Sequence, residues 1–467
     1  MTEDLFPVDE ALIRRFEEMV KKNKTVFFDV EEFEAIIDHY FEQQDNRMAG
    51  TAINLAIEQH PGNTGVLLKQ ARLFILGGKN KEAMKLLDSL EEIEPANTDI
   101  YYTRASLFSY QKQYEQAIRE FEKALLAGEE PDEIYTNIAF EYENMGQYHM
   151  AIQYLKKVLR INPENEAALY ELSFCYEIDN KLEESIAFFN EFLDRYPYSK
   201  TAWFNLGIVY NQLDLYEKAV EAYDFAIAID PSFSSAYFNK ANALANLEHY
   251  RAAIRVYRET FEYEEPEAMT YYYIGECYEK MRSFDRALDE YLNALAVDEN
   301  LSEAWMGAGI ARDELGHTAE AVKSMERAVA LDEINPEYWF ILGDTLLKTG
   351  RTEEAVSAYE KVAGLDPYNT DIWLDYSGVL SNLGKHAEAL RIIEKGLETD
   401  ARNASLLYRK SVYLLRDGKS TEAYRIMQDA LSTDHSRHTE IFDYMPMLKN
   451  DTTILDMIEL FRVDKKQ

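Results

Sequence analysis

The stretch that decides the fold is Lys200–Phe233, which reads KTAWFNLGIVYNQLDLYEKAVEAYDFAIAIDPSF. Counting its first residue as position 1, Trp203 occupies position 4, Gly207 occupies position 8 and Ala219 occupies position 20. Positions 4 and 8 lie on one face of a helix, whereas position 20 belongs to a second helix beyond a turn. Pro231, at position 32, prevents the second helix from continuing. The stretch therefore predicts two antiparallel helices.

The same pattern returns every 34 residues, without insertion, from Val30 to Arg437. Position 20 is alanine in eleven of the twelve units, and Ser185 is the exception. Position 8 is small in every unit but the first, where it is Ile37, and position 4 is always large and apolar and includes all four tryptophans. We expect the small residues at positions 8 and 20 to face each other, so that the two helices approach closely.

Position 15 is a second regular feature, because it carries residues that suit a left-handed helix C-cap. In eight units these are Gly78, Gly146, Asn180, Asp214, Gly316, Gly350, Gly384 and Gly418. A single helical hairpin cannot bury its own apolar faces, but stacked neighbours can. The period therefore predicts an all-α chain of stacked hairpins.

This pattern resembles the tetratricopeptide repeat, whose W-x2-L-G-x2-Y…A-x3-F…P signature is matched over Lys200–Phe233, with Tyr223 in the aromatic position. The resemblance covers about twelve units, and it implies a right-handed superhelical α-solenoid of tandem helix-turn-helix hairpins with a concave groove. We expect an N-terminal capping helix and connector in residues 1–29, the repeats in residues 30–437, and C-terminal capping helices in residues 438–467. The apolar segment Asp451–Arg462 has two readings: a cap over the twelfth unit, or a helix that inserts into a partner or dimerises.

By this resemblance, positions 2, 5, 6, 9, 12 and 13 of each first helix face the groove. Aromatic residues at positions 5 and 9 would supply rigid apolar contact, and asparagines would bracket a peptide backbone amide. Acidic side chains would favour a basic partner. The alternative is that some of these rings pack between repeats. The candidate binding residues are Asn137, Phe140, Tyr170, Phe174, Phe204, Asn205, Phe238, Asn239, Asn242, Tyr272 and Glu276.

The net charge is −36, from 85 acidic and 49 basic residues. A surface this acidic repels nucleic acid and anionic lipid and favours basic partners. The alternative is that the charges only keep the outer helix faces solvated.

No run approaches about 18 apolar residues, so we expect no membrane span. Met1–Glu10 lacks the apolar core of a signal peptide. Cys175 and Cys277 both fall at position 10, three repeats apart, which favours core thiols in a reducing compartment. We therefore expect a cytoplasmic protein.

Motifs for chemistry are missing from the sequence. It has no glycine-rich phosphate loop, no HExxH and no GxSxG, and its histidines lack partners at metal-ligand spacing. We therefore expect no cofactor, no metal and no enzymatic activity. Some members of the resembled family grip acidic C-terminal tails with a lysine at position 5. No unit has lysine or arginine there, which argues against that mode.

The sequence thus favours a non-enzymatic scaffold or adaptor that binds a protein or peptide, with basic character, in the groove. The alternative is a structural subunit of a larger assembly that docks through its convex face or its C-terminal helix. An enzyme or enzyme-regulating domain acting on a carbohydrate or nucleotide is a third class, and no motif supports it. The oligomeric state is left open by the sequence.

Overall fold

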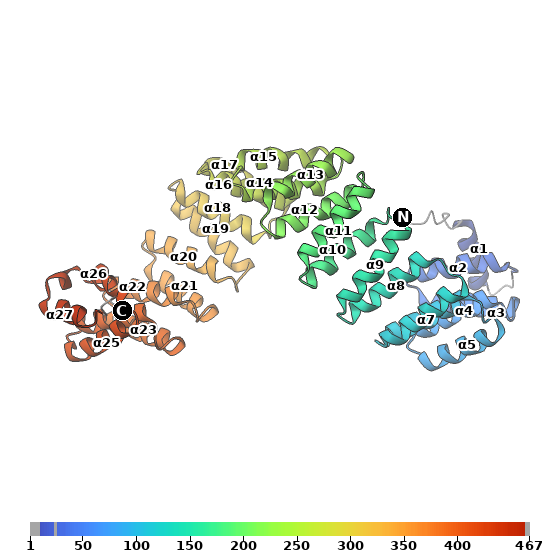
Figure 1. Ribbon diagram of the computed structural model, residues 1–467, viewed down its shortest axis with the longest axis horizontal. Coiled ribbons are helices and arrows are strands. Elements are labelled where there is room, and N and C mark those ends of the chain that lie inside the picture. Colours follow the sequence, from blue (N-terminus) through green and yellow to red (C-terminus); the bar gives the residue numbers. More distant parts are fainter. Residues whose placement is uncertain (1–9, 23–25, 463–467) are drawn as a thin grey trace. The chain divides into compact units, whose positions relative to one another are not determined.

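A computed structural model describes residues 10–22 and 26–462 (Figure 1), and these residues form helices and connecting turns without a strand. The all-α solenoid predicted from the sequence is confirmed. The chain divides into two compact units, one ending at Ala236 and one beginning at Tyr237, which we describe separately. The expectation that Met1–Glu10 is not a signal peptide concerns residues 1–9, which lie outside the described residues.

The N-terminal unit contains one leading helix and six helix pairs among its described residues. The helices are α1 (Glu10–Lys22), α2 (Val30–Glu42), α3 (Asn46–Gln59), α4 (Thr64–Leu76), α5 (Asn80–Ile93), α6 (Thr98–Tyr110), α7 (Tyr114–Ala127), α8 (Pro131–Asn144), α9 (Tyr148–Ile161), α10 (Glu166–Ile178), α11 (Leu182–Arg195), α12 (Lys200–Gln212) and α13 (Tyr216–Ile229).

The C-terminal unit contains six further pairs and two closing helices in its described part. The helices are α14 (Ser234–Asn246), α15 (Tyr250–Glu259), α16 (Ala268–Lys280), α17 (Phe284–Val297), α18 (Ser302–Glu314), α19 (Thr318–Leu331), α20 (Pro336–Lys348), α21 (Thr352–Leu365), α22 (Thr370–Asn382), α23 (His386–Thr399), α24 (Ala404–Arg416), α25 (Ser420–Thr433), α26 (Glu440–Tyr444) and α27 (Thr452–Leu460). Short 3-10 helices span Thr260–Glu262, His435–Thr439 and Pro446–Asn450.

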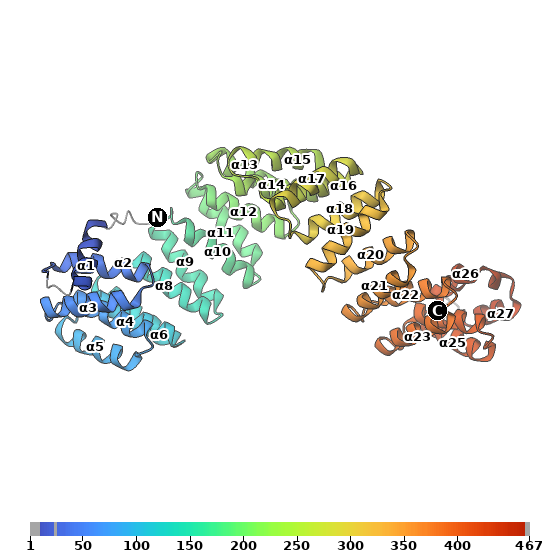
Figure 2. The same ribbon diagram turned by 180° about the vertical axis from the view of Figure 1, so that it is seen from behind.

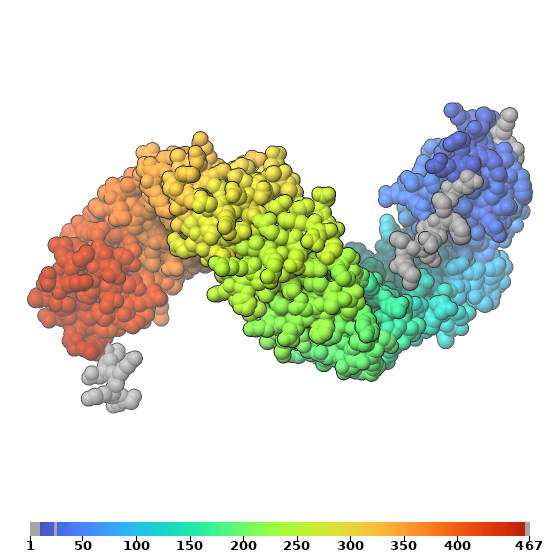
Figure 3. All heavy atoms as spheres, turned by 90° about the horizontal axis from the view of Figure 1, so that it is seen from above, coloured from blue at the N-terminus to red at the C-terminus, as the bar shows by residue number. Residues whose placement is uncertain are grey.

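Within each unit, neighbours in sequence are neighbours in space. A first helix packs against the second helix of its own hairpin, and that second helix packs against the next first helix. The space-filling view shows the same order, since the colours of each unit follow one another along the chain (Figure 3). The buried apolar residues accordingly form successive clusters, each drawn from a few neighbouring helices. In the part of the chain that the structure describes, no helix is long and apolar enough to cross a membrane.

The turn inside each hairpin has the left-handed residue that the sequence predicts at position 15. All eight predicted residues have positive φ. Four further units place non-glycine residues in the same conformation, namely Gln44, Lys112, Glu248 and Arg282, with φ between 56° and 59°. A left-handed conformation is costly for such residues. The repeat geometry therefore fixes the turn even where the local sequence does not favour it.

The tryptophans at position 4 do more than fill space. Each indole Nε1 donates a hydrogen bond to the backbone carbonyl at position 32 of the preceding unit, which ties the connecting loop to the next helix. The four bonds are Trp203 to Pro197 (2.9 Å), Trp305 to Glu299 (2.8 Å), Trp339 to Glu333 (2.9 Å) and Trp373 to Pro367 (2.8 Å). Tyr101 makes the equivalent bond to Pro95 through its hydroxyl, at 2.6 Å.

The close approach of the two helices depends on a third residue as well as on positions 8 and 20. Position 20 is fully buried in every unit, as expected. Where position 8 is glycine, however, the side chain from position 24 of the second helix occupies the space beside it, and this side chain is Tyr223, Tyr291, Met325 or Tyr359. Tyr291 lies between Gly275 and Gly307: a Cβ on Gly275 would come 2.6 Å from this ring, and a Cβ on Gly307 would come 2.5 Å from it. Because the ring is fully buried, it has no room to move away.

Both ends of the described chain are covered. Helix α1 buries Phe16 and Met19 against the first hairpin, beside which it lies in Figure 2. Helix α27 lies at the end of the C-terminal unit in Figure 1, and it buries Ile454 and Ile458 in a cluster with the twelfth hairpin. His435 Nε2 also donates to the Ile458 carbonyl, at 2.8 Å. These contacts favour the capping role of Asp451–Arg462 over insertion into a partner.

Two buried charged side chains in the N-terminal unit have opposite surroundings. Arg104 forms ion pairs with Asp88 (3.2 Å), Glu91 (2.6 Å) and Glu120 (3.2 Å), so its charge is fully compensated. Glu141 is 3% exposed, and its Oε2 atom accepts no hydrogen bond among the described residues. Burial raises the pKa of Glu141, although hydrogen bonds from Ser109 and Asn144 oppose the shift. Glu141 is therefore a destabilising carboxylate at neutral pH.

We predict that Gly275→Ala and Gly307→Ala each lower the free energy of unfolding by about 1–3 kcal/mol, because each added methyl group meets the Tyr291 ring. Since both methyl groups meet one ring, the double variant should lose less than the sum of the single losses. Urea denaturation of the full chain measures these values. Gly364→Ala is the control, because its Cβ would meet no atom within 4 Å; there the helix should gain up to about 1 kcal/mol. Equal losses at Gly364 would contradict the packing explanation.

We predict that Glu141→Gln stabilises the protein by about 1–2 kcal/mol at pH 8, because a neutral amide replaces a buried, underbonded carboxylate. The raised pKa of Glu141 means that the folded state favours the protonated form. The penalty in the wild-type chain is therefore present above the folded-state pKa, and it disappears as the pH falls below the unfolded-state value. The difference in the free energy of unfolding between Glu141→Gln and the wild type should therefore shrink as the pH is lowered from 8 to 4, which denaturation curves measure. Glu177→Gln, on an exposed position of α10, should change stability by no more than about 0.5 kcal/mol.

Candidate protein-binding surface

Exposed aromatic side chains gather on two successive first helices of the N-terminal unit. Phe140 on α8 is 56% exposed, and Tyr170 and Phe174 on α10 are 39% and 47% exposed. Phe174 meets Tyr148 edge-on, with 6.4 Å between ring centroids, and Tyr170 meets Phe204 in the same way at 6.2 Å. We call Phe140, Tyr170 and Phe174 the aromatic surface. Large exposed rings at adjacent positions supply the kind of anchor that protein interfaces use.

Phe204 and Asn205, which the sequence assigned to the groove, lie inside the N-terminal unit. Phe204 is only 6% exposed, because Tyr223 and Phe233 pack against it at 5.8 Å and 4.9 Å between ring centroids. Asn205 is 1% exposed. The alternative reading, in which some rings pack between repeats, therefore describes Phe204. Neither side chain offers a surface to a partner in this conformation.

Asn137 lies beside the aromatic surface, and it is half-buried. Its Nδ2 atom donates to the Glu133 carbonyl at 3.0 Å, so one of its two donor hydrogens is already used. The nearby Glu143 accepts a weak hydrogen bond from Cys175 Sγ at 3.4 Å, and burial raises the pKa of Glu143. Both cysteines are buried free thiols, as the shared position 10 predicts.

The candidate residues in the C-terminal unit are all half-buried. Phe238 meets Tyr257 and Tyr273 edge-on, each at 5.7 Å between ring centroids. The Tyr257 hydroxyl donates to Asn242 Oδ1. The remaining candidates are Asn239, Tyr272 and Glu276. These side chains form a mixed surface of rings, amides and a carboxylate.

Carboxylates on the first helices of the C-terminal unit are bonded by tyrosine hydroxyls. Tyr272 donates to Glu276 Oε1 at 3.0 Å, and Tyr291 donates to Glu279 Oε2 at 2.7 Å. Burial raises the pKa of both glutamates, against the opposing effect of these bonds. A neutral donor leaves the negative charge of a carboxylate uncompensated. These two positions are therefore able to gain a cationic partner.

A cavity that the sequence did not indicate lies further towards the N-terminus, between the first helices α2, α4, α6 and α8. It has a volume of about 440 Å³, and its lining includes Glu34, Lys69, Arg72, Tyr102 and Glu133. Lys69 pairs with Asp38 at 2.6 Å, while Arg72 lies over the Phe41 ring at 4.8 Å. Position 5 was the available signal, since Glu34, Leu68 and Tyr102 occupy it in the first three units. Only Tyr102 of these three is aromatic, so the run of aromatic residues at position 5 did not indicate them.

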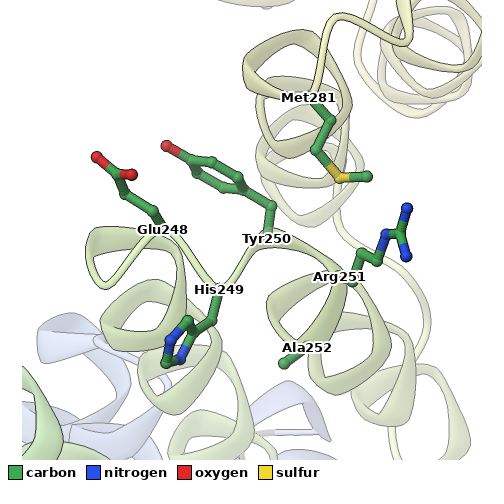
Figure 4. A pocket seen from close by; sticks show the side chains of 6 residues that line it. All are labelled: Glu248, His249, Tyr250, Arg251, Ala252 and Met281. Atoms are coloured by element: carbon green, nitrogen blue, oxygen red, sulfur yellow. The ribbon is translucent and has the colours of Figure 1, made fainter.

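A second cavity, of about 400 Å³, lies at the turn between α14 and α15 (Figure 4). The charged groups of Glu248 and Arg251 lie on opposite sides of Tyr250, and His249 points away from all three. The side chains that line this cavity therefore do not converge on a common point, whereas those of a catalytic site do. Among residues 10–22 and 26–462, no three His, Cys, Asp or Glu side chains gather as a metal site would need.

Three family models match four segments of the chain. The model of the cilia and flagella-associated protein 70 C-terminal domain matches residues 233–441. Models of the tetratricopeptide repeat match residues 133–165 and 201–233, and residues 98–127. A search among curated proteins found no match.

Solved structures with a similar fold include several repeat proteins. One is YrrB, described as a TPR protein with an unusual peptide-binding site: 20% identity, covering 38% of this chain and 92% of that one, with a TM-score of 0.33. Another is the C-terminal part of a TPR repeat-containing protein from Cytophaga hutchinsonii, which is 17% identical. The match covers 54% of this chain and 98% of that one, with a TM-score of 0.44. A chain of the APC/C hetero-tetramer Cut9-Hcn1 is 12% identical. The match covers 91% of this chain and 99% of that one, with a TM-score of 0.40.

The repeat register, the helix pairs and the family models agree on one assignment. The 34-residue period returns in the structure as six helix pairs in each unit, within the described residues. Family models built on this repeat match segments of both units. The chain is a tetratricopeptide repeat protein, and it belongs to a class of helical scaffolds that bind other proteins.

Proposed function

We propose that this protein is a non-enzymatic cytoplasmic scaffold or adaptor that binds a protein or peptide of basic character on its first helices. The aromatic surface carries the proposal, because Phe140, Tyr170 and Phe174 are large rings on successive first helices and each leaves a substantial part of its surface exposed. The cost of exposing such rings to water is recovered when a partner covers them. The absence of motifs for catalysis, nucleic-acid binding or membrane insertion in the sequence supports the same reading.

The charge of the partner follows from the carboxylates on the same helix faces. Glu143 lies beside the aromatic surface, and Glu276 and Glu279 lie on α16 of the C-terminal unit. Burial raises the pKa of all three, so each bears a charge that water solvates poorly. A lysine or arginine from a partner would stabilise that charge. The net charge of −36 would in addition speed the encounter with a basic protein.

A second function, as a structural subunit, is favoured by one observation at the C-terminal end. Leu455 and Leu460 on α27 are exposed, while the other side of this helix caps the twelfth hairpin. A partner in a larger assembly would cover these two leucines. Point substitutions to aspartate, which keep the buried side of α27 intact, distinguish this function from binding at the aromatic surface.

We predict that Phe140→Ala combined with Phe174→Ala removes the principal partner in affinity purification with quantitative mass spectrometry. Each truncated anchor should cost about 1–2 kcal/mol, which together lowers recovery by at least about tenfold. Thermal melting should be unchanged, because both rings are exposed. Tyr368→Ala is the matched control, an 83% exposed ring in a loop of the C-terminal unit.

The partner recovered in this way should also bind more weakly as salt rises, because screening reduces the attraction of opposite charges. Unchanged recovery by a folded double variant would contradict binding at the aromatic surface. Loss of the partner only from Leu455→Asp with Leu460→Asp would support the structural-subunit function instead.

A further inference from the structure

The second helices α9 and α11 form a surface that the proposed groove binding does not use. A cavity of about 260 Å³ lies between them, and its lining includes Lys156, Arg160, Phe188, Phe192 and Tyr196. Arg195 also lines it. We call these six residues the α9–α11 surface. Its cations are unexpected in a chain whose net charge is −36.

Lys156 has no counter-ion in this surface. Its Nζ atom lies 5.3 Å from the ring centroids of both Tyr176 and Phe188. Among the described residues, no carboxylate lies within ion-pair distance of it. Burial lowers the pKa of Lys156; Glu184 and Glu191 oppose this effect from a greater distance, while Arg160 and Lys181 reinforce it by repulsion. The ammonium group is thus desolvated and incompletely compensated.

The other two cations leave the surface positive. Arg160 lies one turn beyond Lys156 on α9, and it too forms no ion pair among the described residues. Arg195 pairs with Glu191 at 2.5 Å, but both side chains are well exposed, and an exposed pair of this kind is worth little. Glu191 also lines the cavity, but its carboxylate pairs with Arg195. An anion that reached the space between Lys156 and Arg160 would therefore meet two cations that form no ion pair among the described residues.

The repeat itself provides a comparison for Lys156. Position 25 is basic in only two units, as Lys156 and Arg258. Arg258 forms an ion pair with Glu290, which occupies position 23 of the following unit. The residue at the equivalent place beside Lys156 is Phe188. The repeat position that places a carboxylate beside Arg258 therefore places a ring beside Lys156. The charge of Lys156 is thus available to an anion from outside the chain.

The same comparison applies to the other two cations. Arg160 is the only basic residue at position 29 in the twelve units, and Arg195 is the only one at position 30. Three basic residues that are rare or unique at their repeat positions, Lys156, Arg160 and Arg195, therefore line one cavity. The ring of Phe188 stacks on that of Phe192 at 5.9 Å, and Phe192 contacts Tyr196 at 4.8 Å between centroids. This row of rings gives the surface an apolar side next to its charges.

We propose that the α9–α11 surface binds an acidic segment of a protein partner. A glutamate or aspartate carboxylate would lie between Lys156 and Arg160, and a neighbouring apolar side chain would pack against Tyr196. Charge-assisted hydrogen bonds at a half-buried site are strong, and the carboxylate would supply the counter-ion that Glu290 supplies to Arg258. Nucleic acid fits less well, because its extended charge would be repelled by the rest of the chain.

Fluorescein-labelled peptides of twelve residues, alternating glutamate with leucine or with phenylalanine, provide the probe for the full chain. Fluorescence anisotropy should show saturable binding that the matching glutamine peptides lack. Lys156→Met should weaken binding at least about tenfold. Phe188→Glu should do the same, because it gives Lys156 an internal partner as in the Arg258–Glu290 pair. Arg258→Met is the control and should bind as the wild type does.

Acetylation of lysines, read by mass spectrometry, gives a second measurement that does not depend on the variants. The bound peptide should protect Lys156 but not the exposed Lys218. Thermal melting confirms that each variant is folded. The proposal is overturned if neither acidic peptide binds below about 1 mM, if Lys156→Met or Phe188→Glu binds like the wild type, or if single-stranded RNA binds this surface more tightly than the peptides. The aromatic surface is on other helices, so Phe140→Ala should leave this binding unchanged.

Discussion

The contact between a glycine at position 8 and the side chain at position 24 is the constraint on which the close approach of the paired helices depends, and Tyr291, held between Gly275 and Gly307, is the example in the C-terminal unit. Gly275 and Gly307 leave a space that the ring fills, and any Cβ there would overlap it. Similar contacts recur because the register recurs: a Cβ on Gly207 would come 2.5 Å from the Tyr223 ring. Once two helices are held this closely, the remaining face of each first helix is fixed towards solvent. The surfaces that we propose for binding are thus a consequence of the packing.

Much of this could be predicted from the sequence, because a regular period specifies spacing along a helix. Alanine at position 20 predicted burial in every unit, and the glycines at position 15 predicted left-handed turns. The period did not indicate that Arg282 would adopt the same turn conformation, since local sequence preference gives no reason for it. There the neighbouring helices impose the conformation.

The exposure of individual side chains was predicted less well. Position 5 carries a ring in both Tyr170 and Phe204, yet only Tyr170 is exposed. The difference comes from residues on other elements, since Tyr223 and Phe233 cover Phe204. Similarly, the sequence identified Trp203 only as a large apolar residue at position 4 and did not indicate its hydrogen bond to the Pro197 carbonyl. Spacing within a helix defines a face, but only the packed structure shows which neighbour covers it.

Charge distinguishes the two surfaces that we propose for binding in the N-terminal unit. The first helices present rings beside Glu143, which suits a basic ligand, whereas α9 and α11 present rings beside Lys156 and Arg160, which suits an acidic one. Opposite preferences on opposite members of the same hairpins would allow a scaffold to hold two partners together.

Native-state hydrogen exchange of the Gly275→Ala variant, measured by mass spectrometry against the wild type, tests the central claim that neighbouring hairpins alone hold each other in place. We expect faster exchange in α15 to α19, which surround the altered contact, and unchanged exchange in α2 to α9. A comparable loss of protection in α2 to α9 would contradict it, because stability would then be shared along the whole chain.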